Sequence, residues 1–224
     1  MIRAVLFDLD GTLLDTPRLI TEAITVVLSQ CGVAPMPAEV IRATIGLRLD
    51  VAFGKLMNKE PDDELVTTAV AHYRTLFTQE IVPQGEKLVF PGVREGLQQL
   101  RADGIVCAIA TSKAYASAHI LLQSSGLRGV FDCVVGADQV KCLKPDPEMA
   151  NHILKELRCE TTQAILVGDT SYDVLMAQNA GLRSIAVTYG VHDVEVLKKY
   201  RPTWMAENFN QVISHIYEKR RGKI

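Results

Sequence analysis

The sequence predicts an α/β protein in which a parallel sheet is interrupted, after its first strand, by an inserted bundle of helices. Apolar runs of strand length recur along the 224 residues, and each has a helix-like pattern beside it. Nearly one hundred residues separate the first run from the second, far more than a single crossover needs. The expected strands are Ile2–Phe7, Ile105–Ala110, Cys133–Val135, Ala164–Val167 and Ser184–Val187.

These strands are short and almost entirely apolar, a pattern typical of parallel strands that are covered on both faces. The expected core is therefore a Rossmann-like parallel sheet with helices on both sides. Near the end of the chain, Thr203–Ala206 is expected to add a short edge strand, and Phe209–Tyr217 a closing helix.

The inserted segment, from about Pro17 to Val82, has a helical pattern almost throughout. Pro17 suits a first helical turn, and Gly32 ends the first helix. The segment Pro83–Pro91 is rich in proline and glycine and is predicted to be the linker that returns to the sheet. Further helices are expected at Ala38–Ile45, Leu49–Met57 and Asp62–Ile81.

The chain is accordingly expected to form two domains. Residues 1–15 and 84–224 would make the α/β catalytic core, and residues 16–83 a helical cap. The two crossings between them, near Asp15 and Gly85, are candidates for a hinge.

Composition excludes several classes of function. The chain is 48% hydrophobic and 22% charged, as in an ordinary globular protein, and its net charge of −2 offers no basic field for nucleic acid. The basic run Lys219–Lys223 is interpreted as a solvated terminus. No apolar run has the length of a membrane span, and the N-terminal residues are expected to enter a strand rather than to form a signal peptide. We therefore expect a cytoplasmic protein without a membrane or nucleic-acid partner.

The five cysteines are odd in number, scattered, and free of any paired CxxC spacing. This pattern favours reduced thiols over a disulfide framework or a zinc site. They are Cys31, Cys107, Cys133, Cys142 and Cys159.

The strongest chemical signal follows the first strand, where Asp8 and Asp10 precede the turn Gly11-Thr12. Two carboxylates so close together raise each other's pKa unless a positive charge lies between them. The simplest partner is a hard divalent cation with oxygen ligands, and Mg²⁺ is the usual one where a phosphate also binds.

Two further strand ends carry groups suited to phosphate. Thr111 and Ser112 follow the second strand and precede a helix, whose N-terminal amides favour anions. Lys144 lies in a loop stiffened by the following Pro145, where it can supply a positive charge. Taken singly, the hydroxyls are better explained as a helix cap and Lys144 as a surface lysine.

The fourth strand ends in Gly168 and Asp169, with Asp173 one helical turn further on. Alone, these acids are ordinary features of a helix start. The carboxyl ends of parallel strands, however, meet at one edge of the sheet, which is where ligands bind in open α/β folds. Together the strand ends make a metal site, a phosphate cradle and a carboxylate nucleophile.

This pattern resembles the haloacid dehalogenase superfamily of phosphatases. The family has a DxD-G-T strand end, a Thr or Ser after the second strand, a lysine before the fourth, and a G-D-x-x-x-D turn. All four are present, in order, as Asp8/Asp10, Thr111, Lys144 and Asp169/Asp173. The helical insertion resembles the cap of the phosphoglycolate phosphatase-like branch.

The resemblance implies a role for each residue. Asp8 would attack phosphorus and become an aspartyl phosphate, and Asp10 would protonate the leaving alkoxide and later deprotonate a water.

The resemblance also implies how phosphate and metal are held. Thr111, the Ser112 amide and Lys144 would bind the phosphoryl oxygens. The ligands of Mg²⁺ would be the Asp8 carboxylate, the Asp10 carbonyl and Asp169, with Asp173 orienting Asp169 or a metal-bound water.

Single residues separate branches of this family. The family's dehalogenases and phosphonatases lack the second aspartate, so Asp10 favours phosphoester chemistry. Phosphonatases use a cap lysine, whereas the loop Gly46-Leu47-Arg48 offers an arginine. Arg48 is a candidate for substrate contact, and a position at the surface is the alternative.

The expected activity is Mg²⁺-dependent hydrolysis of a small phosphorylated metabolite, of the phosphoglycolate phosphatase type. A nucleoside 5'-monophosphate phosphatase, an inorganic pyrophosphatase and a sugar phosphomutase remain alternatives, since they share the core motifs. A non-catalytic phosphate-binding module is disfavoured because both Asp8 and Asp10 are present. The sequence does not decide between a monomer and a homodimer.

Overall fold

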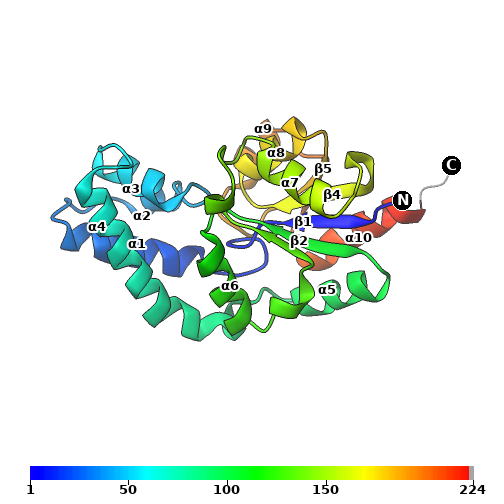
Figure 1. The fold of residues 1–224 in the computed structure, drawn as a ribbon, viewed down its shortest axis with the longest axis horizontal. Helices are drawn as coiled ribbons and strands as arrows, with labels where there is room; N and C mark the ends of the chain where they lie inside the picture. The colour runs from blue at the N-terminus through cyan, green and yellow to red at the C-terminus, as the bar shows by residue number, and fades with distance from the viewer. Residues whose placement is uncertain (222–224) are drawn as a thin grey trace.

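The structure is a computed structural model that describes residues 1–221, with a six-stranded parallel sheet at its centre (Figure 1). The strand order β3-β2-β1-β4-β5-β6 is that of a Rossmann sheet, so the predicted fold class is confirmed. The strands are β1 (Ala4–Phe7), β2 (Val106–Ala110), β3 (Cys133–Val135), β4 (Ala164–Gly168), β5 (Arg183–Val187) and β6 (Trp204–Ala206).

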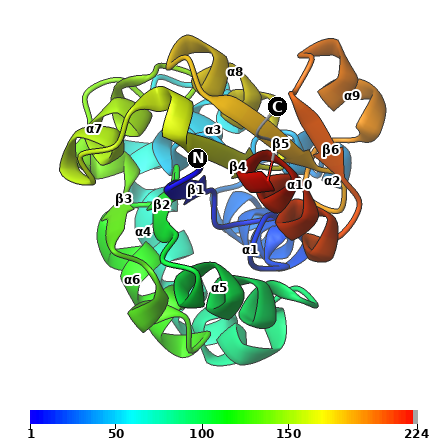
Figure 2. The ribbon, with the colours of Figure 1, turned by 90° about the vertical axis from the view of Figure 1, so that its right-hand side faces the viewer.

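Helices cover both faces of this sheet, and β1 shows how the sequence divides its side chains between them. Val5 and Phe7 point to one face and pack in the larger core, while Ala4 and Leu6 point to the other. The first face is covered by α5 (Val93–Ala102), α6 (Tyr115–Ser124) and α10 (Phe209–Arg221), and the second by α7 (Glu148–Glu156) and α8 (Ser171–Asn179), as Figure 2 shows end-on.

The end of the chain agrees with its predicted strand and helix, since β6 pairs with β5 at the sheet edge and α10 follows it. A short helix before them, α9 (Val194–Lys199), was not expected from the sequence. The side chains of the basic run Lys219–Lys223 lie outside the described residues.

The inserted segment forms a group of helices at one end of the molecule, beyond the edge of the sheet (Figure 1). Helix α1 begins at Pro17 and buries Ile20, Ile24 and Val27, which recur at helical spacing. The remaining helices are α2 (Ala38–Arg42), α3 (Leu49–Met57) and α4 (Glu64–Leu76). The division into a core of 1–15 and 84–224 and a cap of 16–83 stays a prediction.

The return to the sheet differs from the expected linker. Helix α4 continues into one π-helical turn, η1 (Phe77–Ile81), and then a 3₁₀ helix, η2 (Val82–Leu88). Pro83 does not break this path because proline is tolerated in the first turn of a helix.

The two chain crossings pair with each other just beyond this 3₁₀ helix. The Asp15 amide donates to the Leu88 carbonyl at 2.7 Å, and the Phe90 amide to the Leu13 carbonyl at 3.1 Å. A short two-stranded ribbon therefore ties the end of the first motif to the return segment.

The strand order reverses between β1 and β4, and this reversal positions the site. β1 pairs with β2 on one side and with β4 on the other, in register from Ala4 to Phe7. The residues that follow β1, β2 and β4 therefore converge at the switch point where open α/β sheets bind ligands.

Candidate active site

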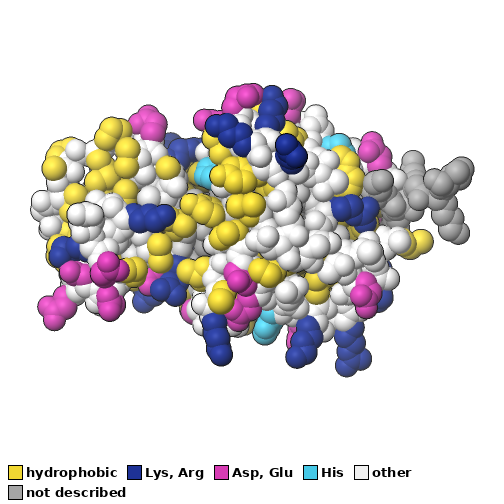
Figure 3. Space-filling model, turned by 90° about the horizontal axis from the view of Figure 1, so that it is seen from above, with side chains coloured by type: hydrophobic (Ala, Val, Ile, Leu, Met, Phe, Trp, Pro, Cys, Tyr) yellow, Lys and Arg dark blue, Asp and Glu magenta, His cyan; other side chains and the backbone are white. Residues whose placement is uncertain are grey.

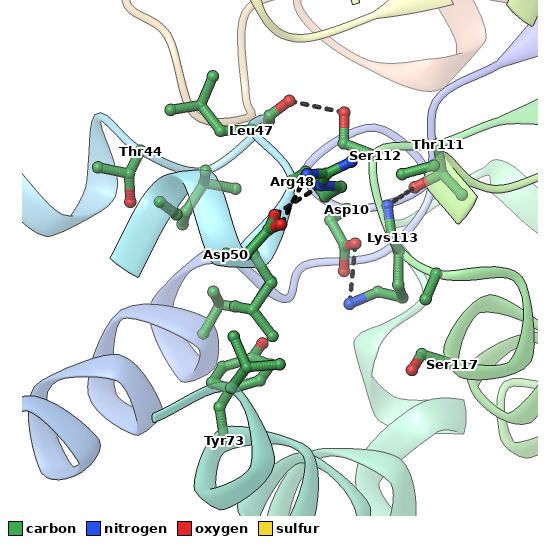
Figure 4. Close-up of a pocket in the computed structure, with 18 of the residues that line it drawn as sticks. Asp10, Thr44, Leu47, Arg48, Asp50, Tyr73, Thr111, Ser112, Lys113 and Ser117 are labelled. Carbon is green, nitrogen blue, oxygen red and sulfur yellow. Dashed lines mark hydrogen bonds and ion pairs between the residues drawn. The ribbon is translucent and has the colours of Figure 1, made fainter. Parts of the chain in front are cut away.

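A cavity of about 550 Å³ lies between the carboxyl edge of the sheet and the inserted helices (Figure 4). Its floor includes Asp8 and Asp10 from the β1 turn and Thr111 and Ser112 from the end of β2. Its other wall comes from α1, α3, α4 and the loop before α3.

Lys144 joins two of the predicted acids at the sheet edge. Its Nζ donates to Asp8 Oδ1 at 2.7 Å and to Asp173 Oδ1 at 2.6 Å, and all three residues are buried. Asp173 Oδ2 also accepts from the amide and the hydroxyl of Thr170, at 3.0 and 2.6 Å. The lysine is thus a fixed charge between the β1, β4 and β3–α7 segments, which the sequence alone left open.

Asp169 lies fully buried behind this pair. Its Oδ1 accepts from the Thr12 hydroxyl at 2.8 Å and its Oδ2 from the Val191 amide at 2.7 Å. Gly11 and Gly190 close around it so tightly that a Cβ at either position would collide with the carboxylate. The glycine of the first motif is therefore required by the Asp169 carboxylate as well as by its φ of +86°.

The three buried carboxylates are short of positive charge. One oxygen of each of Asp8, Asp169 and Asp173 lies within 4.8 Å of the others, and among the described residues Lys144 is the one ammonium bonded to them. Burial raises the pKa of Asp8 to about 7 and that of Asp169 well above its ordinary value. A divalent cation at this cluster would restore both to the ionised form, so the donor set fits a hard metal ion.

The lysine itself is held in its charged form. Burial lowers the pKa of Lys144, but the Asp173 and Asp8 carboxylates outweigh burial and leave the pKa above its ordinary value. A positive charge next to Asp8 is therefore a permanent feature of the site.

Asp10 points away from this cluster and into the cavity. Its Oδ1 accepts from the Thr16 hydroxyl at 2.6 Å, and its Oδ2 lies 3.2 Å from Lys113 Nζ (Figure 4). The ammonium of Lys113 also lies 4.5 Å from the ring centre of Phe77 in η1. Asp8 and Asp10 are thus held by different partners, although only one residue separates them.

The predicted phosphate-binding residues lie on the same floor. Thr111 is buried, and its Oγ1 accepts from the Lys113 amide at 3.2 Å. The Ser112 hydroxyl donates to the Gly46 carbonyl at 2.6 Å and so connects the sheet edge to the loop before α3.

Arg48, the candidate from the inserted helices, also lines the cavity. Its Nε and Nη2 donate to the two oxygens of Asp50 at 2.6 and 2.7 Å, a bidentate pair. The neighbouring helix α2 is bonded to the loop after β5, because Arg42 Nη2 donates to the Gly190 carbonyl at 2.6 Å.

Several residues of the site were not predicted from the sequence. Thr12 and Thr16 carry a signal, since hydroxyls close behind two acids can bond carboxylates, and Lys113 directly follows the predicted phosphate residues. Tyr73, in the last turn of α4, reaches the cavity without any motif beside it.

The family model for haloacid dehalogenase-like hydrolase matches residues 5–187, so the chain belongs to that family and the resemblance seen in its motifs is confirmed.

Relatives narrow the class. The chain is 44% identical over 209 residues to the probable phosphatase IndB of Dickeya dadantii, covering 93% of this chain and 91% of the relative. It is 34% identical over 196 residues to a phosphoglycolate phosphatase of Nitrosospira multiformis, covering 86% of each.

A solved structure agrees with these relatives. A predicted phosphatase from Clostridium acetobutylicum matches with a TM-score of 0.85 and 28% identity, over 97% of this chain and 99% of that one. The chain is thus an enzyme, a hydrolase of the phosphatase class, and resembles the phosphoglycolate phosphatases.

The distribution of charge on the surface is consistent with the small net charge of the sequence. On the face drawn in Figure 3, basic and acidic side chains are interspersed and form no extended field of one sign. Within residues 1–221, no helix is both long and apolar enough to cross a membrane.

Proposed function

We propose that the protein is a Mg²⁺-dependent phosphatase of small phosphate monoesters that works through a phosphorylated Asp8. One observation carries the proposal: a buried carboxylate, bonded to a permanent ammonium, opens into a cavity that also contains a second, separately held carboxylate. A nucleophile and a proton carrier are the two groups that such a transfer requires.

The residues that would hold the metal are Asp8, the Asp10 carbonyl and Asp169, with Asp173 beside them. When bound, Mg²⁺ neutralises carboxylate and phosphoryl charge that would otherwise repel each other. The excess of buried acids over bonded lysine supports this assignment.

In the first step, an Asp8 oxygen bonds to phosphorus while the bond from phosphorus to the ester oxygen breaks. The leaving oxygen takes a proton from Asp10, which the Thr16 hydroxyl holds at the cavity floor. Lys144, in contact with Asp8, lies beside the transferring group and offsets its charge.

In the second step, a water attacks the phosphorus of the aspartyl phosphate and gives its proton to Asp10. The bond between phosphorus and the Asp8 oxygen breaks, so the Asp8 carboxylate and inorganic phosphate are released and the enzyme is restored. Positioning and electrostatics account for most catalysis in such transfers.

The residues at the end of β2 would bind the remaining phosphoryl oxygens. Thr111 and the Ser112 amide lie on the cavity floor, next to the N-terminus of α6, where anions are favoured. The substrate is a small phosphorylated metabolite in this proposal. A cytoplasmic location also stays a prediction.

The proposal is tested by replacing Asp8 with Asn and measuring hydrolysis of p-nitrophenyl phosphate in Mg²⁺. Turnover should fall by about 10⁴-fold or more, because the amide cannot take part in the transfer. Asp62→Asn, an exposed aspartate before α4, is the matched control and should keep full activity. Near-normal turnover in the Asp8 variant would contradict the assignment of Asp8 as the nucleophile.

A further inference from the structure

The wall of the cavity opposite the catalytic acids differs from the floor, because aliphatic and aromatic side chains make up most of it. These side chains come from α1, α3, α4 and η1 and are buried or half-buried. They are Ile20, Ile24, Leu49, Val70, Tyr73 and Phe77.

Tyr73 adds one polar atom to this apolar wall. The residue is only 5% exposed, and among the described residues no hydrogen bond is found for its hydroxyl. Figure 4 shows the hydroxyl end of the ring directed into the cavity. Burial, with a smaller contribution from Asp10, raises the pKa of this hydroxyl, so it stays a donor. A donor that faces the cavity and has no protein acceptor is suited to an acceptor on a ligand.

The positive charges that line the cavity beside this wall and across from it are already engaged. Arg48 is held by both oxygens of Asp50, and Lys113 by Asp10 and the ring of Phe77. Arg74, the third cation among the described lining residues, is exposed, where water and salt screen its charge. A second anionic group on the substrate, such as a carboxylate, would therefore find no buried cation to meet it.

The volume of the cavity also favours a substrate with a large uncharged group. About 550 Å³ falls within the range that drug-sized ligands occupy, roughly 300–1,000 Å³. A phosphate ester of a two-carbon acid would fill a small part of this space and leave the apolar wall wet. A larger apolar group would instead cover that wall.

We propose that the chamber selects phosphate esters whose alcohol carries a bulky, uncharged, aromatic group with an acceptor for the Tyr73 hydroxyl, rather than small carboxylated esters. This inference rests on the proposed phosphatase function and names its substrate class. Tyr73 and Phe77, stacked with ring centres 6.3 Å apart, supply the aromatic surface for such a group.

The test compares three esters of primary alcohols in Mg²⁺, so that the leaving groups are chemically alike: ethyl phosphate, phosphoglycolate and 2-phenoxyethyl phosphate. We expect kcat/KM for 2-phenoxyethyl phosphate to exceed that for ethyl phosphate by roughly tenfold or more. Phosphoglycolate should do no better than ethyl phosphate.

A variant then tests the hydroxyl. Tyr73→Phe removes one donor and keeps the ring, and should narrow the preference for 2-phenoxyethyl over ethyl phosphate by roughly three- to tenfold. Tyr200→Phe, at the end of α9 and outside the cavity, is the matched control and should leave the preference unchanged.

The outcomes separate the two proposals. If phosphoglycolate is the best of the three substrates, or if the Tyr73 variant keeps the wild-type preference, the inference about the chamber is wrong while the phosphatase proposal stands. If none of the three esters is hydrolysed, the proposed function itself fails and the inference falls with it. Should the variant not fold, the comparison of the three esters on the unaltered enzyme still decides.

Discussion

The floor and the wall of the same cavity differ in chemistry, because the floor is charged and hydrogen-bonded and the wall is mostly apolar. At the floor and directly behind it, Asp8, Asp169 and Asp173 are buried, and each is bonded to a lysine, a hydroxyl or an amide. On the wall, apolar side chains surround the Tyr73 hydroxyl, which faces the cavity and has no hydrogen bond to another described residue. The floor therefore offers charged and hydrogen-bonding groups suited to a phosphoryl group and a cation, whereas the wall offers an apolar surface suited to an organic group.

This difference separates chemistry from selection. A floor with fixed charges serves any phosphate ester, because the transferred group is always the same. The wall touches the part of the substrate that varies. Changes on the floor should therefore affect every substrate alike, and changes on the wall should alter the ratio between substrates.

The largest effect after loss of the nucleophile is expected for Lys144→Met, which leaves Asp8 and Asp173 facing each other without a cation. Turnover of all three esters should fall by roughly 10³-fold, and unfolding should become easier by about 3–5 kcal/mol. Activity assays and urea denaturation measure the two. Lys198→Met, on the surface of α9, is the control and should change neither. A substrate-dependent loss would break the separation of floor from wall.

A second prediction concerns the metal. EDTA should abolish turnover, and added Mg²⁺ should raise the melting temperature, since a ligand at 100 times its Kd stabilises the folded state by about 2.7 kcal/mol. Asp169→Asn should remove this thermal shift, because it removes one buried carboxylate from the cluster. A full Mg²⁺-dependent shift in that variant would show that the metal binds elsewhere.

The residues that could be predicted from the sequence differ between the floor and the wall of the cavity in the same way. The acids after β1 and β4 and the lysine before β4 could be predicted because parallel strands bring their carboxyl ends to one edge. Nothing local marks Tyr73, which reaches the cavity only because α4 packs across it. The pairing of Arg48 with Asp50 was equally hidden, since either could have faced solvent.

The boundary between the inserted helices and the sheet shows a further limit. Proline and glycine in 83–91 indicated a linker, yet most of it is helical, and the crossings pair at Asp15 and Leu88. Such pairing depends on two segments distant in sequence, so no local pattern reveals it.

A smaller effect is expected for Thr16→Val, which removes the hydroxyl that holds Asp10. We expect kcat to fall by roughly tenfold for every ester, because one hydrogen bond to a charged group is lost. Thr25→Val, which removes a hydroxyl bonded only to the α1 backbone, is the control. A change in KM for one ester alone would contradict a role through Asp10.

The smallest effect is expected for Ile24→Val in the wall. Removing one methylene should cost about 0.5–1.5 kcal/mol of stability and narrow the preference for 2-phenoxyethyl over ethyl phosphate about fourfold or less. Ile109→Val, fully buried in β2 and away from the cavity, should cost similar stability and leave the preference unchanged. Equal effects of the two variants on the preference would remove the distinction between wall and core.

The central claim is that Asp8 carries the phosphoryl group. The most direct measurement is to mix the enzyme with substrate and Mg²⁺, quench with acid within milliseconds, and locate phosphate in the peptides by mass spectrometry. We expect one phosphoryl group on the peptide Val5–Thr16, assigned to Asp8 and absent from the Asp8→Asn variant. Phosphate on another residue, or steady turnover with no phosphorylated enzyme at any quench time, would contradict the account.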